Sequence, residues 1–209
     1  MSEMRAKPGN LFPKAKTLFA TIDQLMNEKE HVVVAIDGDC AAGKTTLSTL
    51  LSLLYDCQII HMDHFFLRPE QRTPERTLTP GGNIDYERFN KEILSQLKKN
   101  APFSYRPFDC ITEDFEEAIE ISADKLTLIE GSYSHHPEFQ DGYDLKVFLS
   151  IPADVQTARI LKRNGEDMLK RFQHTWIPME KQYAKAFNIQ ENSDLQLDYL
   201  NMQGEGDDA

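Results

Sequence analysis

The residues with the clearest chemical role form a glycine-rich stretch in the first quarter of the chain. Positions 38–45 read GDCAAGKT and fit the pattern G-x-x-x-x-G-K-[ST] throughout. In this pattern the amides of a curved loop surround phosphate groups, and the next helix adds the positive end of its dipole. Lys44 is expected to reach the β and γ phosphates, and Thr45 to offer its hydroxyl to Mg²⁺. The predicted binding residues for ATP, or another nucleoside triphosphate, are Gly38, Asp39, Cys40, Ala41, Ala42, Gly43, Lys44, Thr45 and Thr46.

The segments on both sides of this loop are the ones that it needs. Residues 32–36, VVVAI, form the continuous apolar run of a strand that is covered on both faces. Leu47, Leu50, Leu51 and Leu54 repeat with the spacing of one helical face. A strand, a tight loop and a helix therefore follow one another in the required order, which makes a chance glycine turn the weaker interpretation.

Two acidic residues end predicted strands further along the chain. Asp63 follows the strand QIIHM at 58–62, and Glu130 follows the buried strand at 126–129. Ligands of parallel α/β sheets bind beyond the carboxyl ends of the strands, so both side chains are expected to face the phosphates. Asp63 is the candidate base for an acceptor hydroxyl, and Thr45 with Asp63 or Glu130 is the candidate Mg²⁺ site.

Two arginines are spaced to contact phosphate oxygens. Arg159 and Arg163 lie four residues apart in a helix that is predicted to begin at Pro152, so they share one face. We expect Arg159 to bind the nucleotide and Arg163 to act in catalysis as a closing cation. The alternative is an ordinary solvated basic face.

The stretch 67–84, LRPEQRTPERTLTPGGNI, is predicted to be a long irregular loop because it contains three prolines and two glycines. Arg68, Arg72 and Arg76 give it a basic character. The loop either contacts an acidic substrate or is a solvated excursion.

The remaining periodic segments complete an alternation of strands and helices. Helices are predicted at 14–28, from 86 to about 100, from 152, at 170–174 and at 176–187, and strands at 146–151 and 195–199. This alternation predicts an α/β fold: a P-loop NTPase-type three-layer sandwich, with a parallel sheet, helices on both faces and a small helical lid. We expect one domain over residues 1–209, with the lid at about 159–175 and a disordered acidic tail at about 203–209.

Composition narrows the class of partner. The 23 basic and 34 acidic residues give a net charge of −11, which argues against nucleic acid or an anionic membrane as the main partner. The three cysteines have no C-x-x-C spacing, and no apolar run reaches the length of a membrane span. We therefore expect a cytoplasmic protein with reduced thiols that acts on a small molecule; a homo-oligomer is compatible with the sequence.

Other classes of nucleotide-binding protein fit the sequence less well. A GTPase switch would carry D-x-x-G, yet none of the ten glycines has an aspartate three residues before it. The base-reading motif N-K-x-D is also missing, since Asn90-Lys91 continues as Glu92-Ile93. The histidines at 61, 64, 135 and 136 suggest no complete zinc site.

Several separated motifs together resemble the uridine kinase and phosphoribulokinase family of P-loop kinases. They are GDCAAGKTT at 38–46, MDHFF at 62–66, NIDYERF at 83–89, YRPFD at 105–109, LIEGSY at 128–133 and RILKRNG at 159–165. They occur in the family's order and span most of residues 31–198.

The resemblance implies an ATP- and Mg²⁺-dependent kinase and assigns further residues. Asp63 would be the catalytic aspartate, and the acceptor site would be formed by Asp63, Phe66, Asp85, Tyr105, Arg106 and Glu130. The 5′-hydroxyl of uridine or cytidine is the expected acceptor. Because Asp109 is followed by Cys110 where the family has a histidine nearby, pantothenate, nicotinamide riboside and sugar phosphates stay open as acceptors. A nucleotide-binding regulatory module without transfer activity is the third interpretation.

Overall fold

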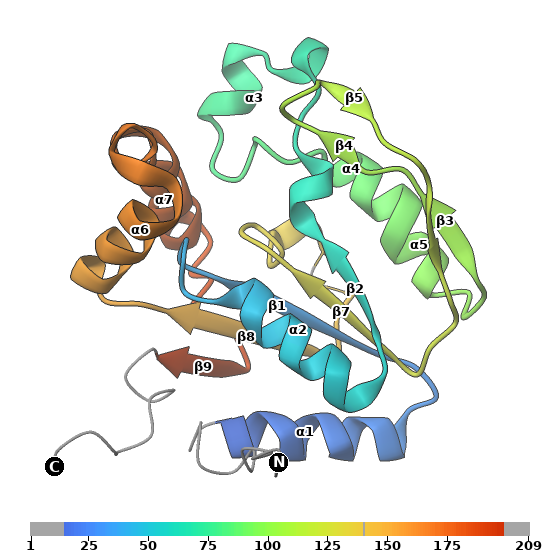
Figure 1. Ribbon diagram of the computed structural model, residues 1–209. Coiled ribbons are helices and arrows are strands. Elements are labelled where there is room, and N and C mark those ends of the chain that lie inside the picture. The colour runs from blue at the N-terminus through green and yellow to red at the C-terminus, as the bar shows by residue number, and fades with distance from the viewer. Residues whose placement is uncertain (1–14, 140, 199–209) are drawn as a thin grey trace, which may run out of the picture.

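The computed structural model describes residues 15–139 and 141–198 (Figure 1). Its centre is a five-stranded, entirely parallel sheet in the order β2-β7-β1-β8-β9. The strands are β1 (Val32–Gly38), β2 (Gln58–His61), β7 (Leu126–Glu130), β8 (Leu145–Ser150) and β9 (Leu195–Asp198). The predicted strands and their parallel arrangement are confirmed; the predicted tail at 203–209, together with Lys14 and Tyr199, lies outside the described residues.

Helices cover both faces of this sheet. They are α1 (Ala15–Glu28), α2 (Lys44–Tyr55), α3 (Pro74–Leu78), α4 (Tyr86–Phe89), α5 (Ser95–Leu97), α6 (Ala153–Arg171) and α7 (Ile177–Ala186). A π-helical turn, η4 (Asn90–Leu94), joins α4 to α5, and a second one, η6 (Phe172–Trp176), joins α6 to α7. None of the helices in residues 15–139 and 141–198 is long and apolar enough to cross a membrane.

The alternation of side chains along β1 produces two cores. Val32, Val34 and Ile36 face the core that contains α1 and α2, together with Leu18 and Leu51. Val33 instead belongs to the core formed with the α4–α5 segment and α7, which includes Phe89 and Tyr183. All of β1 is buried, so the sheet is the middle of three layers, as the sequence predicts.

Two regions depart from the predictions. The stretch 67–84 is not wholly irregular, because Pro69 and Pro74 each occupy the first turn of a short helix, η3 (Pro69–Gln71) and α3. The Thr73 side chain caps α3 by accepting a hydrogen bond from the Arg76 amide.

The second departure is a pair of small antiparallel ribbons at 103–121, where the sequence predicts a turn followed by an unassigned segment. β3 (Phe103–Tyr105) pairs with β6 (Ile119–Ile121), and β4 (Phe108–Asp109) pairs with β5 (Asp114–Phe115). Strands of two or three residues are too short to give a periodic pattern in the sequence.

Candidate active site at the glycine-rich loop

The glycine-rich loop joins β1 to α2 at the carboxyl edge of the sheet. Gly38 has φ +142°, and a Cβ there would lie 2.1 Å from the Leu149 carbonyl oxygen of the neighbouring strand, so only glycine fits. Gly43 has φ +108° and Ala41 has φ +61°, which gives the loop its curvature. The amides of Ala41, Gly43, Lys44 and Thr45 donate no hydrogen bond to the described part of the chain. These N–H groups and the start of α2 form an anion site of the predicted kind.

Lys44 is held directly over this loop. Its Nζ donates to the carbonyl oxygens of Gly38 at 2.7 Å and Asp39 at 3.0 Å, and to Ser132 Oγ at 3.2 Å. The side chain is therefore fixed in position before any ligand arrives. Thr45 and Thr46 follow in the first turn of α2, where both are exposed.

Two predicted loop residues, Asp39 and Cys40, also have contacts or burial within the protein itself. Asp39 Oδ2 accepts a hydrogen bond from the Ile151 amide at 3.1 Å, which ties the loop to the end of β8. The Cys40 thiol is buried, which raises its pKa to about 11 and makes it a poor nucleophile.

Helix α6 braces the outer side of the loop. Gln156 donates to the Cys40 carbonyl oxygen at 2.9 Å, and Arg159 donates to the Ala41 carbonyl oxygen at 2.9 Å. The Arg159 guanidinium therefore contacts the loop backbone, and its predicted contact with the nucleotide stays a prediction. Arg163, one turn further on, is exposed and donates to Asn164 Oδ1 at 2.7 Å.

A hydrogen-bonded group of three residues brings Glu130 to the start of α2. Glu130 is buried and accepts hydrogen bonds from Thr45 Oγ1 at 3.2 Å and 3.3 Å, while His61 Nδ1 lies 2.6 Å from its Oε1. The hydrogen bond to Glu130 raises the pKa of His61. The structure thus brings together Thr45 and Glu130, as the sequence predicts, and adds His61 as their neighbour.

Asp63 lies in the 3₁₀ turn η2 (Met62–Phe65) that follows β2; the residue is accessible to solvent, although much protein surrounds its carboxylate. It forms no hydrogen bond or ion pair with the described residues. Its pKa is raised, chiefly because surrounding protein reduces its solvation; Lys44 opposes this rise and Glu130 adds to it. The influence of both charges places Asp63 in the same electrostatic environment as the loop.

The other predicted acceptor residues are built into the wall beside Asp63. Tyr105 is buried, and its hydroxyl lies 2.9 Å from His64 Nδ1. Phe66 forms an isolated bridge with Ile84 and packs against the core. Asp85 is buried and caps α4: Oδ1 accepts from the Arg88 amide at 3.0 Å and Oδ2 from Gln71 at 2.8 Å.

Arg106 is hydrogen-bonded to the backbone of β5 and the residue after it. Its guanidinium donates to the carbonyl oxygens of Glu116 and Phe115, each at 2.7 Å. The predicted substrate contacts of Phe66, Asp85, Tyr105 and Arg106 stay predictions.

An open pocket of about 350 Å³ lies next to Asp85 and is lined by Arg68, Gln71, Asp85, Arg88, Lys91 and Phe115, among others. The Arg88 side chain is 9% exposed and lies between the rings of Phe65 and Phe115. Its Nη2 donates to the His64 carbonyl oxygen, while Nε and Nη1 have no hydrogen-bond partner in the described part of the chain, and Nε lies 3.9 Å from Glu92 Oε2. This pocket therefore combines acidic and basic groups near Asp63.

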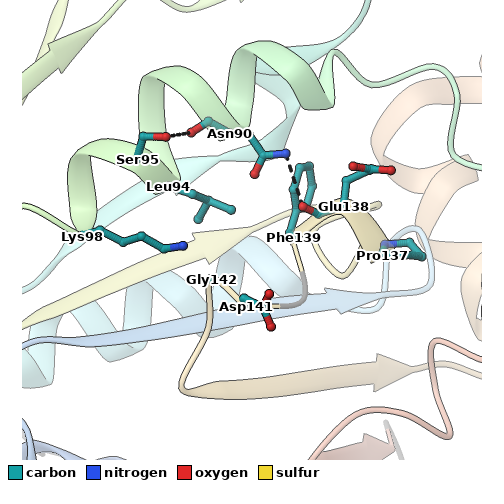
Figure 2. A pocket seen from close by; sticks show the side chains of 9 residues that line it. All are labelled: Asn90, Leu94, Ser95, Lys98, Pro137, Glu138, Phe139, Asp141 and Gly142. Atoms are coloured by element: carbon teal, nitrogen blue, oxygen red, sulfur yellow. Dashed lines mark hydrogen bonds between the residues drawn. The ribbon is translucent and has the colours of Figure 1, made fainter.

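A second pocket, of about 320 Å³, lies between the α4–α5 segment and residues 137–139 and 141–142 (Figure 2). Asn90 donates to the Glu138 carbonyl oxygen across it at 3.2 Å, and Lys98 and Asp141 also line it. None of its lining residues belongs to the glycine-rich loop or to η2, so it is separate from the candidate active site.

Four residues of the site region were not among the predicted ones: Asp37, His61, Ser132 and Glu180. Asp37 is buried, and its carboxylate accepts hydrogen bonds from the amides of Gly38 and His135 and from the Tyr183 hydroxyl. The only local signal is a charged residue inside the apolar run that precedes the loop. Ser132 and Glu180 contact the loop from distant parts of the chain, which no local pattern reveals.

Solved structures share this fold. A possible uridine kinase from Bacillus stearothermophilus is 20% identical, with a TM-score of 0.62 over 87% of this chain and 100% of that one. A protein provisionally named as a fructose transport system kinase, from Silicibacter sp. TM1040, is 22% identical, with a TM-score of 0.68 over 88% of this chain and 98% of that one. A provisionally named P-loop containing kinase from Saccharomyces cerevisiae, which has a circular permutation, is 11% identical, with a TM-score of 0.62 over 88% of this chain and 98% of that one.

Comparisons of the sequence found no match: no family model matches the chain, and a search of curated proteins found no match. The structural neighbours show that the chain has the α/β fold of the P-loop kinases, as the sequence motifs predict.

Proposed function

We propose that this protein is a kinase that transfers the γ-phosphoryl group of ATP to a hydroxyl group of a small molecule. The observation that supports it most is the glycine-rich loop, where Lys44 Nζ is held 2.7 Å from the Gly38 carbonyl oxygen and Thr45 Oγ1 lies 3.2 Å from the Glu130 carboxylate. Phosphoryl transfer needs a phosphate cradle, a group that orients the acceptor hydroxyl, and cations that neutralise the transferring group.

The proposal assigns protein groups to each of these three requirements. The loop amides and Lys44 hold the phosphates, and Asp63 accepts the proton of the acceptor hydroxyl. The raised pKa of Asp63 makes it a better base than an ordinary aspartate. Arg163 supplies a cation from a lid at about 159–175, formed by the end of α6 and by η6.

The oxygen atoms of Thr45, Glu130 and Asp63 fit a magnesium ion that also binds the nucleotide. Mg²⁺ in such sites takes one or two protein oxygens and keeps its waters and phosphate oxygens. Thr45 and Glu130 already meet at 3.2 Å, which suits this ligand set. Within residues 15–139 and 141–198, no group of three or more His, Cys, Asp and Glu side chains could hold a metal without such additional ligands. When bound, Mg²⁺ would neutralise charge on the phosphates.

The leading acceptor is the 5′-hydroxyl of uridine or cytidine. One structural neighbour carries the name of a possible uridine kinase, and the motifs around Asp63, Asp85 and Tyr105 resemble that family. In this proposal Phe66, Tyr105 and Arg106 border the acceptor, which is a small molecule and not a nucleic acid.

One observation favours a second acceptor class, an acidic metabolite such as a sugar phosphate or pantothenate. Arg88 is almost fully buried, and its Nε and Nη1 have no hydrogen-bond partner among the described residues, with the Glu92 carboxylate 3.9 Å from Nε. Arg68 and Lys91 line the same pocket. Arg72 and Arg76 do not line this pocket and form close ion pairs with Glu113 and Glu87, each at 2.7 Å. Arg68 is itself paired with Glu70 at 3.1 Å, so Arg88 and Lys91 are the main basic groups of the pocket. A phosphate or carboxylate of the acceptor would compensate the charge of Arg88.

The test is ADP release from Mg·ATP in the presence of uridine, cytidine, nicotinamide riboside, pantothenate or sugar phosphates, each supplied separately. We expect turnover that depends on one acceptor, and a fall of roughly 10²- to 10⁴-fold in kcat for Asp63→Asn, the usual contribution of a positioned base. Lys44→Ala serves as the variant without the phosphate clamp, and Glu191→Gln as a surface control that also loses one negative charge.

Turnover with uridine or cytidine supports the nucleoside acceptor, and turnover with the acidic compounds alone supports the second class. ATP binding without acceptor-dependent turnover would support a regulatory module. Asp63→Asn with the activity of the unmodified protein would remove Asp63 from the mechanism.

A further inference from the structure

Glu180 of α7 reaches across to the glycine-rich loop, although it lies 140 residues further along the chain. Its Oε2 accepts a hydrogen bond from the Cys40 amide at 3.0 Å, and its Oε1 accepts one from Ser132 Oγ at 2.8 Å. Reduced solvation raises the pKa of Glu180, and the nearby charge of Lys44 opposes that rise. A carboxylate therefore contacts a loop whose amides are suited to anions.

Ser132 connects Glu180 to Lys44. The Ser132 hydroxyl accepts a hydrogen bond from Lys44 Nζ at 3.2 Å and donates its own hydrogen to Glu180. Because the other two N–H groups of Lys44 go to the carbonyl oxygens of Gly38 and Asp39, all three donors of the ammonium are in use. Glu180 thus accepts the hydrogen bond of the Cys40 amide, and Ser132 accepts the third hydrogen bond of Lys44.

The other amides of the loop differ from the Cys40 amide in their hydrogen bonding. The amides of Ala41, Gly43, Lys44 and Thr45 have no partner among the described residues, whereas the Cys40 amide is bound to a carboxylate. In loops of this pattern the backbone amides hold the α and β phosphates, and the lysine reaches toward β and γ. Lys44 is therefore the engaged donor that reaches toward the γ phosphate, and the Glu180–Ser132 pair binds both Lys44 and the Cys40 amide.

Arg163 and Lys44 bring positive charge close to Cys40. Arg163 lies close enough to the Cys40 thiol to lower its pKa, against the rise that burial causes, and it also lowers the pKa of Asp63. In the absence of nucleotide, the carboxylate of Glu180 supplies negative charge among these cations and N–H donors.

We propose that Glu180 occupies the γ-phosphate position in the nucleotide-free protein, and that a nucleoside triphosphate displaces it whereas a diphosphate leaves it in place. This inference rests on the proposed nucleotide site and adds a residue that discriminates between the two nucleotides. Since Tyr183, one turn further along α7, donates to Asp37 at 2.9 Å, the helix stays joined to the loop when Glu180 is released. ATP must then replace a carboxylate that ADP does not contact, so Glu180 weakens ATP binding selectively.

Glu180→Gln is the most direct variant. Its amide oxygen can accept from Cys40, and its NH₂ group can donate to Ser132 Oγ, so the contacts are kept while the charge is lost. We expect Mg·ATP to bind roughly tenfold more tightly, equivalent to about 1.4 kcal/mol, while the Kd for Mg·ADP changes less than about twofold. Isothermal titration calorimetry without acceptor measures both constants, and thermal unfolding verifies that the variant is folded.

Glu191→Gln is the matched control, since it removes one exposed negative charge from the turn after α7. We expect it to leave the ratio of the two dissociation constants unchanged. Ser132→Ala removes the bridge to Lys44, and we expect it to favour ATP in the same direction as Glu180→Gln.

Equal changes in ATP and ADP affinity in Glu180→Gln, or weaker ATP binding, would overturn the inference and make Glu180 a support of the loop. In that case the unmodified protein still binds both nucleotides, and the proposed kinase function stands. Failure of the unmodified protein to bind either nucleotide would overturn both.

Discussion

Asp37 shows how a single buried carboxylate fixes the geometry of the loop. It lies within β1, and its Oδ1 accepts from the Gly38 amide at 2.7 Å. Its Oδ2 accepts from the His135 amide at 3.0 Å and from the Tyr183 hydroxyl at 2.9 Å. The start of the loop, the segment after β7 and helix α7 are therefore joined through one side chain.

We predict that Asp37→Asn lowers the free energy of unfolding by roughly 2–4 kcal/mol, because an amide NH₂ would face N–H and O–H donors in a buried place. Tyr183→Phe removes only one of the three donors and should cost about 1–2 kcal/mol. Urea denaturation followed by circular dichroism measures both. An Asp37→Asn protein as stable as the unmodified one would show that its hydrogen bonds contribute no net stability.

The sequence predicts the site residues that belong to local motifs, and it misses those that reach the site through the fold. Thr45 and Glu130 end up in contact because Glu130 is the last residue of β7 and Thr45 lies just beyond the loop that follows β1, and the ends of these neighbouring parallel strands meet at one edge. Glu180 contacts Cys40 across 140 positions of sequence, and only the path of α6 and α7 brings them together. Asp85 illustrates a further limit, since a motif does not reveal that its carboxylate also caps a helix.

At the scale of elements, helix α6 consists of two parts, with a break in the helical backbone between them. Its first part braces the loop through Gln156 and Arg159. At Gly165 the backbone leaves the helical region, with φ +79° and ψ 175°, a conformation that favours glycine. Arg163 lies just before this break and is exposed, in the position that a cation of a closing lid needs.

We predict that Arg163→Ala lowers kcat at least tenfold and changes the KM for the acceptor by less than about threefold, since a closing cation acts mainly in the transition state. Lys162→Ala is the matched control, because it removes a neighbouring exposed positive charge from the same helix. Steady-state kinetics at saturating Mg·ATP test both variants. Equal effects of the two substitutions would assign Arg163 to the solvated basic face.

The long elements follow from the sequence and the short ones do not. Runs such as VVVAI at 32–36 are typical of buried strands, and α2 follows from its leucine spacing. The arginines at 72 and 76 look like substrate contacts in the sequence, yet their ion pairs with Glu113 and Glu87 hold α3 against neighbouring elements. Such pairings depend on tertiary structure. The number of arginines in the stretch 67–84 therefore does not reveal that two of them serve a structural role.

At the scale of the whole molecule, the chemical groups lie at one edge of the sheet and the aromatic core lies beside them. Figure 1 shows α6 and α7 beyond the ends of β1 and β8, with α3 and the β4–β5 ribbon beyond β2. The core next to this edge contains His136, which stacks on Tyr86 with ring centroids 4.9 Å apart and lies parallel to the ring of Tyr183. The packing of these rings therefore contributes to stability and also supports the neighbouring edge of the sheet.

This arrangement predicts that the protein loses stability in mild acid. Burial lowers the pKa values of His64 and His136 to about 4 and also lowers the pKa of His135. In the unfolded chain these imidazoles have pKa values of about 6.5, so between about pH 6.5 and pH 4 the unfolded state binds more protons. Stability is therefore fully present above that range and falls as the pH is lowered through it.

For His136, which is 6% exposed, the loss between pH 7 and pH 5 should be about 1–2 kcal/mol. We expect His136→Phe, which keeps an aromatic ring in the stack, to reduce the pH dependence by that amount, while His174→Gln on the exposed surface of η6 leaves it unchanged. Urea unfolding at the two pH values gives the comparison. If His136→Phe and the unmodified protein lost the same stability, His136 would have to be protonated in the folded state at pH 5, and the aromatic stack would not exclude its charge.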